Sequence, residues 1–98
     1  MNHRLDSDLV PLHRAVLIGN IDIVKTLIKF FAEVNSCDCE GKSPLHYACE
    51  VGNYKIVEIL VNNKAIVNHC DEFGNSALHL ACHNMHGPVI MYLGNAGI

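Results

Sequence analysis

The chain repeats itself at a fixed interval of 33 residues, and this period constrains its fold more than any other feature. Three similar segments begin at Val10, Ser43 and Ser76, and they read VPLHRAVLIGNIDIVKTLI, SPLHYACEVGNYKIVEILV and SALHLACHNMHGPVIMYLG. On this offset, leucine recurs as Leu12, Leu45 and Leu78, and histidine recurs as His13, His46 and His79. The pattern predicts one supersecondary unit that is copied along the chain.

The second unit carries the start and stop signals of two short helices. Ser43 is a good N-cap and Pro44 suits the first helical position, so one helix begins there and ends near Gly52. Asn53 is the N-cap of a second helix, whose apolar side lies within residues 56–61. A pair of helices this short cannot bury its apolar stripe alone, so we expect the units to stack into a solenoid.

The spaced features of this unit resemble the ankyrin repeat: SPLHYA, a glycine four residues later, an apolar helix and a connector of the form VN, D and G. The resemblance covers roughly residues 6–98. It implies an all-α solenoid of stacked helix-turn-helix units joined by β-hairpin-like fingers. It also implies a single domain over residues 1–98, with repeats at about 6–38, 39–71 and 72–98, the last of them incomplete.

Most of the recurring residues are assigned to this scaffold rather than to chemistry. A catalytic side chain is rarely needed three times at fixed spacing, and in the ankyrin family the recurring histidine bridges backbone groups and neighbouring repeats. The residues that we expect to be structural are Leu12, His13, Gly19, Gly41, Ser43, Pro44, Leu45, His46, Gly52, Gly74, Leu78 and His79.

Composition narrows the classes of function. The net charge of −3 and the pI near 6.1 provide no basic field for nucleic acid. No apolar run approaches the roughly 18 residues of a membrane span, and the N-terminus does not resemble a secretory signal. Five cysteines without such a signal favour free thiols in a reducing compartment, the cytoplasm or nucleus.

The cysteines have a structural and a metal-binding interpretation. Cys49 and Cys82 share one repeat position, where we expect a small buried residue. Equivalent residues of stacked repeats lie roughly 8–10 Å apart, too far for a disulfide, which needs Cα atoms within about 7 Å. The metal-binding alternative is zinc held by Cys37, Cys39, His69 and Cys70, but the same spacing opposes convergence on one ion.

Other sites of chemistry are not expected. His79, His83 and His86 lie about one helical turn apart, and we expect His83 and His86 to be exposed near a helix end. They would bind only adventitious metal. The sequence contains no nucleophile elbow, phosphate-binding glycine loop or HExxH motif, so we expect no enzyme activity, cofactor or functional metal.

The ankyrin resemblance implies protein recognition through the finger tips and the exposed face of each first helix. Transferred by position, this surface comprises Leu17, Glu40, Lys42, Glu50, Val51, Glu72, Phe73, Asn75, His83 and Asn84. Phe73 is either a binding hot spot or packs on the adjacent finger. The three glutamates either form an acidic strip for a basic peptide, interrupted by Lys42, or are a solvated surface.

Some positions depart from the repeat pattern. Met85 replaces a helix-ending glycine, at a cost of roughly 1 kcal/mol for a left-handed residue, and Phe31 and Lys64 also stand where the family has glycine. The sequence ends before a third finger, and we expect Ile90, Leu93 and Ile98 to face no further repeat. The chain is then either a piece of a longer array or self-associates through this open C-terminal face.

Three hypotheses of function follow. The first is a non-catalytic adaptor or scaffold module that binds a protein partner, whose identity the sequence does not specify. The second is a structural segment of a larger protein whose activity lies elsewhere. The third is a thiol- or metal-responsive protein that uses its five cysteines.

Overall fold

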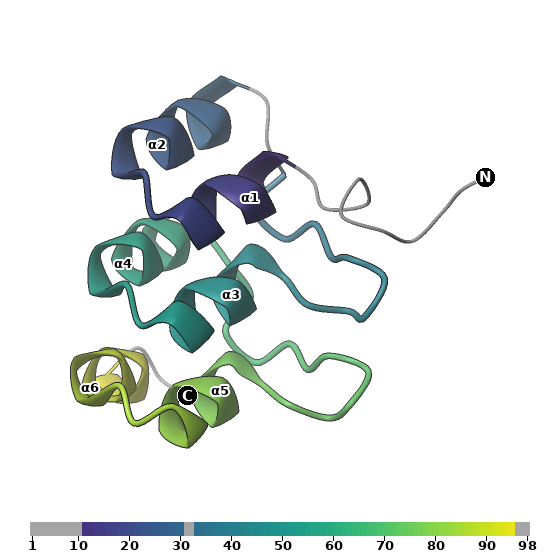
Figure 1. Ribbon diagram of the computed structural model, residues 1–98, viewed down its shortest axis with the longest axis vertical. Helices are drawn as coiled ribbons and strands as arrows, with labels where there is room; N and C mark the ends of the chain where they lie inside the picture. The colour runs from purple at the N-terminus through teal and green to yellow at the C-terminus, as the bar shows by residue number, and fades with distance from the viewer. Residues whose placement is uncertain (1–10, 31–32, 96–98) are drawn as a thin grey trace.

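The computed structural model describes residues 11–30 and 33–95, and these form three helix pairs (Figure 1). The pairs are α1 (Pro11–Ile18) with α2 (Ile21–Phe30), α3 (Pro44–Val51) with α4 (Tyr54–Asn62), and α5 (Ala77–His83) with α6 (Gly87–Asn95). Within these residues, no helix is long and apolar enough to cross a membrane.

The helices form two layers. The first helices α1, α3 and α5 stack in one layer, and α2, α4 and α6 stack beside them in the other (Figure 1). The stack measures 39 × 29 × 20 Å. The connectors between pairs project on the side opposite the second helices (Figure 1). We call residues 37–42 the first finger and residues 70–75 the second finger.

The fingers are turns rather than regular sheet. In the described part of the chain the only β pairing is an isolated antiparallel bridge between Cys70 and Ser76. The resemblance to hairpins therefore comes from the reversal of the chain and not from paired strands. The all-α solenoid expected from the repeat is confirmed.

The second repeat forms its helices through the expected caps. Ser43 accepts a hydrogen bond from the amide of His46, and the imidazole of His46 accepts one from the amide of Ser43, which completes a capping box. Gly52 ends α3 with φ 85°, in the left-handed region that glycine adopts at little cost. The Asn53 side chain then caps α4 by accepting a hydrogen bond from the amide of Ile56.

The replacement of the family's glycine by Met85 and by Lys64 affects the backbone at both positions. Met85 takes φ 59° and Lys64 takes φ 74°, so two side chains occupy a conformation that favours glycine. Asn84 acts as the C-cap of α5 in place of a glycine. Phe31 lies outside the described residues.

The core is aliphatic and runs through all three pairs. It contains Leu12, Ala15, Val16, Val24, Leu45, Ala48, Cys49, Ile56, Val57, Leu60, Ala77, Ala81, Val89 and Leu93. All six helices contribute side chains to it. Burial of this apolar area is the main force that holds neighbouring repeats together.

Two expectations about the last repeat are wrong. Leu93 is fully buried rather than open, because α6 packs its side chain against the rest of the core. Cys82 is exposed, whereas its repeat equivalent Cys49 is buried because α5 covers α3. Ile90 is partly buried, and Ile98 lies outside the described residues.

Candidate functional site

Asp38 fixes the shape of the first finger. Its Oδ1 accepts hydrogen bonds from the amides of Glu40 at 2.9 Å and Lys42 at 3.0 Å. Its own amide donates to the carbonyl of Lys42 at 3.0 Å. Gly41 takes φ 79° at the tip. These bonds hold the side chains of Glu40 and Lys42 on a defined turn rather than on a free loop.

Asp71 fixes the second finger in the same way. Its Oδ1 accepts hydrogen bonds from the amides of Phe73 and Asn75, both at 2.9 Å, and its amide donates to the carbonyl of Asn75 at 3.0 Å. Gly74 takes φ 82° at this tip. The exposed position of Phe73 is therefore set by a rigid backbone.

The two fingers are joined along their backbones. The amide of Glu72 donates to the carbonyl of Glu40 at 2.9 Å. A side chain at Gly41 would place its Cβ 3.1 Å from the amide nitrogen of Glu72, a tight contact, so this close approach of the fingers favours glycine. Glu40 and Glu72 consequently lie on one continuous surface.

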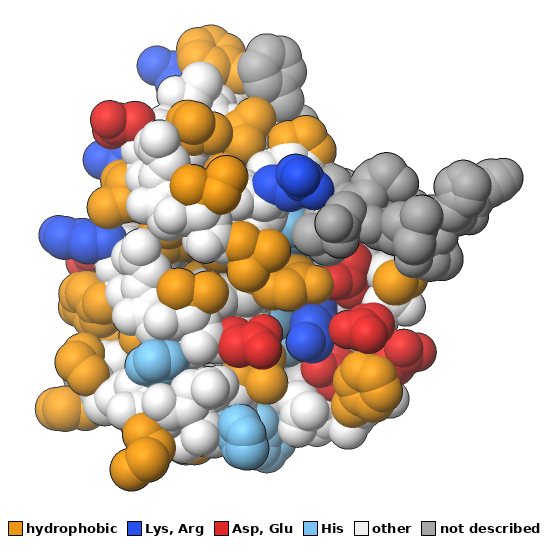
Figure 2. Space-filling view, viewed as in Figure 1, with side chains coloured by type: hydrophobic (Ala, Val, Ile, Leu, Met, Phe, Trp, Pro, Cys, Tyr) orange, Lys and Arg blue, Asp and Glu red, His pale blue; other side chains and the backbone are white. Residues whose placement is uncertain are grey.

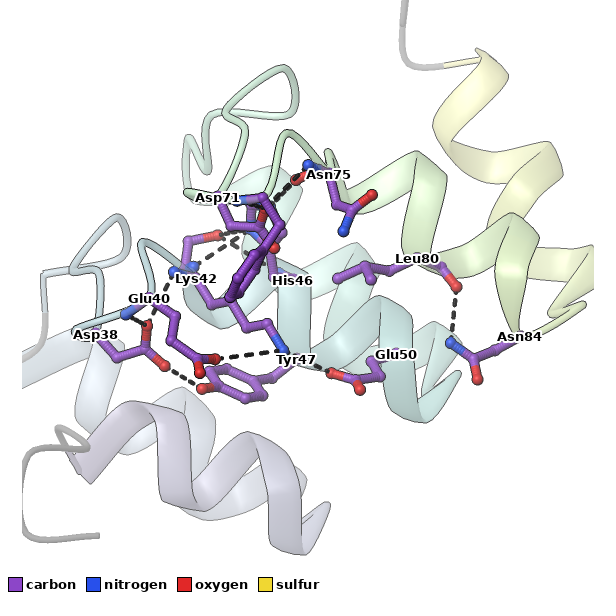
Figure 3. Close-up of polar contacts among 12 residues, drawn as sticks. Asp38, Glu40, Lys42, His46, Tyr47, Glu50, Asp71, Asn75, Leu80 and Asn84 are labelled. Carbon is purple, nitrogen blue, oxygen red and sulfur yellow. Dashed lines mark hydrogen bonds and ion pairs between the residues drawn. The ribbon is translucent and has the colours of Figure 1, made fainter. Parts of the chain in front are cut away.

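Lys42 links the first finger to the end of α3. Its Nζ lies 3.8 Å from Glu40 Oε1 and 3.7 Å from Glu50 Oε1 (Figure 3). It also lies 5.6 Å from the centre of the Tyr47 ring. Lys42 is thus held by two carboxylates and an aromatic face, a combination that suits a cation.

Tyr47, on α3, supports the first finger. Its hydroxyl donates a hydrogen bond to Asp38 Oδ2 (Figure 3). Burial, this hydrogen bond and the negative charges of Asp38, Glu40 and Glu50 all raise the pKa of the Tyr47 hydroxyl. Burial is the largest of these causes, and the three neighbouring carboxylates add to it.

The second finger lacks this support. Leu80 occupies the position equivalent to Tyr47, and Asp71 Oδ2 is buried with no hydrogen-bond partner in residues 11–30 and 33–95. Asp71 as a residue is only 5% exposed. A buried carboxylate oxygen with no donor is unusual, because desolvation is normally compensated by hydrogen bonds.

Apolar side chains flank these charges. Phe73 at the tip of the second finger is 64% exposed. Leu17, Ile18 and Val51, at the ends of the first helices, are 42%, 78% and 45% exposed. Figure 2 shows acidic, basic and hydrophobic side chains gathered on the finger side of the molecule. The ring of Phe73 is therefore mostly exposed, and its role as a binding hot spot stays a prediction.

Two of the expected surface residues have scaffold contacts instead. The carbonyl of Asn75 accepts a hydrogen bond from His46 Nε2 at 2.8 Å, since Nδ1 of that ring already accepts from the Ser43 amide. Asn84 caps α5, and its Nδ2 donates to the carbonyl of Leu80 at 2.9 Å (Figure 3). Eight members remain, and we define the finger surface as seven of them, Leu17, Glu40, Lys42, Glu50, Val51, Glu72 and Phe73, which leaves out His83. His83 is exposed at the end of α5.

The recurring histidines lie in different environments. His13 and His46 are buried, and burial lowers the pKa of each imidazole despite a hydrogen bond to a carbonyl. His13 Nε2 lies 2.8 Å from the carbonyl of Ser36, and its Nδ1 is buried with no hydrogen-bond partner among the described residues. His79 forms a capping box with Ser76 and is exposed on the open side of α5.

His86 is partly buried rather than fully exposed as expected. Its Nε2 lies 3.0 Å from the carbonyl of Glu50, near the C-terminus of α3. Its ring covers Gly52, where a Cβ would approach within 2.4 Å. His86 stands 33 residues after Asn53 and 66 after Asn20, both of which use their side chains as helix N-caps. This alignment of His86 with two helix-capping asparagines could have predicted from the sequence that its side chain packs on the scaffold.

Two of the four residues considered as zinc ligands lie close together. Cys37 Sγ lies 3.3 Å from His69 Nε2, which also lies 2.9 Å from the carbonyl of Gly41. Burial and the neighbouring Asp38 raise the pKa of the Cys37 thiol, which disfavours the thiolate that a metal needs. In residues 11–30 and 33–95, no three His, Cys, Asp or Glu side chains are grouped to hold a metal ion.

Comparisons with known proteins identify the family. A family model for ankyrin repeats, in three copies, matches residues 12–98. No curated protein sequence matches the chain significantly. The matched range covers nearly the whole sequence and all three helix pairs that the structure describes. The chain therefore belongs to the ankyrin-repeat family.

Proposed function

We propose that this chain is a non-catalytic module that binds a protein partner through the finger surface. Ankyrin repeats are generally protein–protein interaction modules. The observation that carries the proposal for this surface is Phe73, whose ring is 64% exposed on a turn that Asp71 holds rigid. An exposed aromatic on a fixed backbone loses little conformational freedom when it binds.

The proposal extends to repeat boundaries and compartment. Repeats at about 6–38, 39–71 and 72–98 each contribute one first helix to the same layer. The five cysteines are free thiols in the structure, and this supports a reducing compartment such as the cytoplasm or nucleus.

A quantitative pull-down tests this function. The tagged chain and its Phe73→Ala variant are compared with Met91→Ala, a control at a residue on α6 that is 71% exposed. We expect specific proteins to be lost with Phe73→Ala and retained with Met91→Ala. Identical sets of captured proteins for all three baits would contradict the proposed surface.

A second candidate function is self-association through the open face of α5. His46 and Cys49 on α3 are buried where α5 covers them, whereas the equivalent His79 and Cys82 on α5 are exposed. This face has the composition of a repeat–repeat interface. Sedimentation velocity over a wide range of concentration tests it, and a strictly monomeric folded species at high concentration would exclude it.

A further inference from the structure

We propose that the finger surface binds a basic segment of its partner, in which lysine or arginine stands beside an apolar side chain. The inference rests on the proposed function and specifies the chemistry of the partner. It follows from the charge balance of the fingers, the buried and unpaired Oδ2 of Asp71, and a comparison of the two fingers.

The fingers carry a large excess of negative charge. Residues 37–42 and 70–75 contain four carboxylates, those of Asp38, Glu40, Asp71 and Glu72, and one cation, Lys42. Lys42 is already shared between Glu40 and Glu50. A cationic partner would be attracted to this surface, and an acidic partner would be repelled.

The buried, unpaired oxygen of Asp71 adds to the negative charge of the second finger, although it is not itself exposed to a partner. Asp38 Oδ2 is satisfied by the hydroxyl of Tyr47, but Asp71 Oδ2 is buried with no donor because Leu80 stands in the equivalent place. The negative charge of Asp71 also acts on His46. The second finger therefore holds a carboxylate that nothing in the described chain neutralises directly.

The first finger shows how such a surface holds a cation. Lys42 lies between two carboxylates and over the ring of Tyr47. In the second finger the position equivalent to Lys42 is Asn75, so the resident cation is missing. The second finger still offers a carboxylate and an aromatic side chain, Glu72 and Phe73, side by side in the sequence and both exposed.

Exposed apolar side chains beside the carboxylates would add to the specificity of this surface for its partner. Phe73 follows Glu72, and Val51 follows Glu50, so each exposed carboxylate has an exposed apolar neighbour. A segment that alternates basic and apolar residues matches this arrangement, with its cations at the glutamates and its apolar side chains at Phe73 and Val51.

Fluorescence anisotropy with two synthetic peptides tests the inference. One peptide alternates arginine and leucine, and the other, of equal length, alternates glutamate and leucine. We expect only the basic peptide to bind, with an affinity that falls as salt rises. Glu72→Gln should weaken binding about threefold to fivefold and Phe73→Ala about tenfold. Lys42→Gln should strengthen binding, since it releases two carboxylates.

The control is Glu58→Gln on α4, away from the fingers, where the carboxylate pairs with Lys55 at 3.9 Å. This variant should bind the basic peptide like the wild type. Equal binding of both peptides, or an equal effect of Glu58→Gln and Glu72→Gln, would overturn the inference. If the pull-down finds a partner that depends on Phe73 but is not basic, the proposed function stands and this inference fails.

Discussion

Tyr47 donates a hydrogen bond to Asp38 Oδ2, and the equivalent pair in the next repeat, Leu80 and Asp71, leaves the carboxylate oxygen buried and unpaired. Leu80→Tyr places a hydroxyl where Tyr47 has one. We expect the free energy of unfolding to rise by about 1 kcal/mol, the usual net contribution of an intramolecular hydrogen bond. Urea denaturation measures the change.

Leu80→Phe is the matched control for that substitution. It adds the same ring without the hydroxyl, so it separates the hydrogen bond from the extra apolar area. A Leu80→Phe variant as stable as Leu80→Tyr would show that Asp71 gains nothing from the new donor.

Gly52 is constrained both by its backbone and by its neighbour. It has φ 85°, and a Cβ there would meet the ring of His86 at 2.4 Å. Gly19 also has φ 85°, but its Cβ would meet only Asn53 Nδ2, at 3.6 Å. We expect Gly19→Ala to cost about 1 kcal/mol from left-handed strain, and Gly52→Ala to cost more than about 2 kcal/mol because overpacking is added.

The double variant Gly52→Ala with His86→Asn separates overpacking against the imidazole from left-handed strain at Gly52. Asparagine is the residue at the equivalent positions, Asn20 and Asn53. Denaturation curves should show the loss in the His86→Asn background shrinking to that of Gly19→Ala. A loss that stays at its full size would mean that the imidazole is not the obstacle.

Replacing each of two exposed methionines by glycine should change the stability of the chain in opposite directions. Met85 has φ 59° and is 85% exposed, so Met85→Gly relieves strain and should stabilise the chain by about 1 kcal/mol. Met91 lies inside α6 and is 71% exposed, so Met91→Gly should destabilise it by about 1 kcal/mol. Melting temperatures that shift in the same direction would refute the role assigned to the backbone at Met85.

The repeat period predicted most of the fold, because each local signal agreed with the stacking that it requires. Ser43 and Gly52 bound α3, and His46 and Cys49 are buried beneath α5. The period could not predict the different burial of Cys82. Burial depends on what covers a residue, and the same repeat position is covered on α3 and open on α5.

The candidate surface was less predictable than the scaffold. Sequence position placed Phe73 at a finger tip, but only the packing of the second finger decided that its ring is exposed. Lys42 seemed to interrupt an acidic strip, whereas it joins Glu40 to Glu50. These outcomes depend on side-chain contacts between separate elements, which a linear pattern does not contain.

The thiols should react in two classes. Cys37, Cys39, Cys70 and Cys82 are exposed, whereas Cys49 is buried and burial raises the pKa of its thiol to about 12. We expect a thiol reagent at pH 8 to modify the exposed cysteines of the native chain and to reach Cys49 only after unfolding. Mass spectrometry of the labelled chain identifies which cysteines have been modified. Modification of Cys49 at the rate of the exposed cysteines would contradict its burial beneath α5.

Stability should fall when the pH drops below about 6.5, because two histidines are buried. Burial lowers the pKa of His13 and His46 from 6.5, so between their folded and unfolded pKa values the unfolded chain binds more protons. Their contribution is complete above pH 6.5 and is lost as the pH falls through the lowered values. Urea denaturation at pH 7.5, 6.5 and 5.5 measures this slope.

The variant His46→Gln identifies the source of that slope. It removes one titrating group, so the dependence of unfolding free energy on pH between 7.5 and 5.5 should become shallower, whatever the variant's absolute stability. Asp38 does not interfere in this window. Although its burial opposes the shift, hydrogen bonds from Tyr47 and two backbone amides lower its pKa below 3.8, so its contribution is lost only in stronger acid. An unchanged slope in His46→Gln would assign the acid sensitivity to other groups.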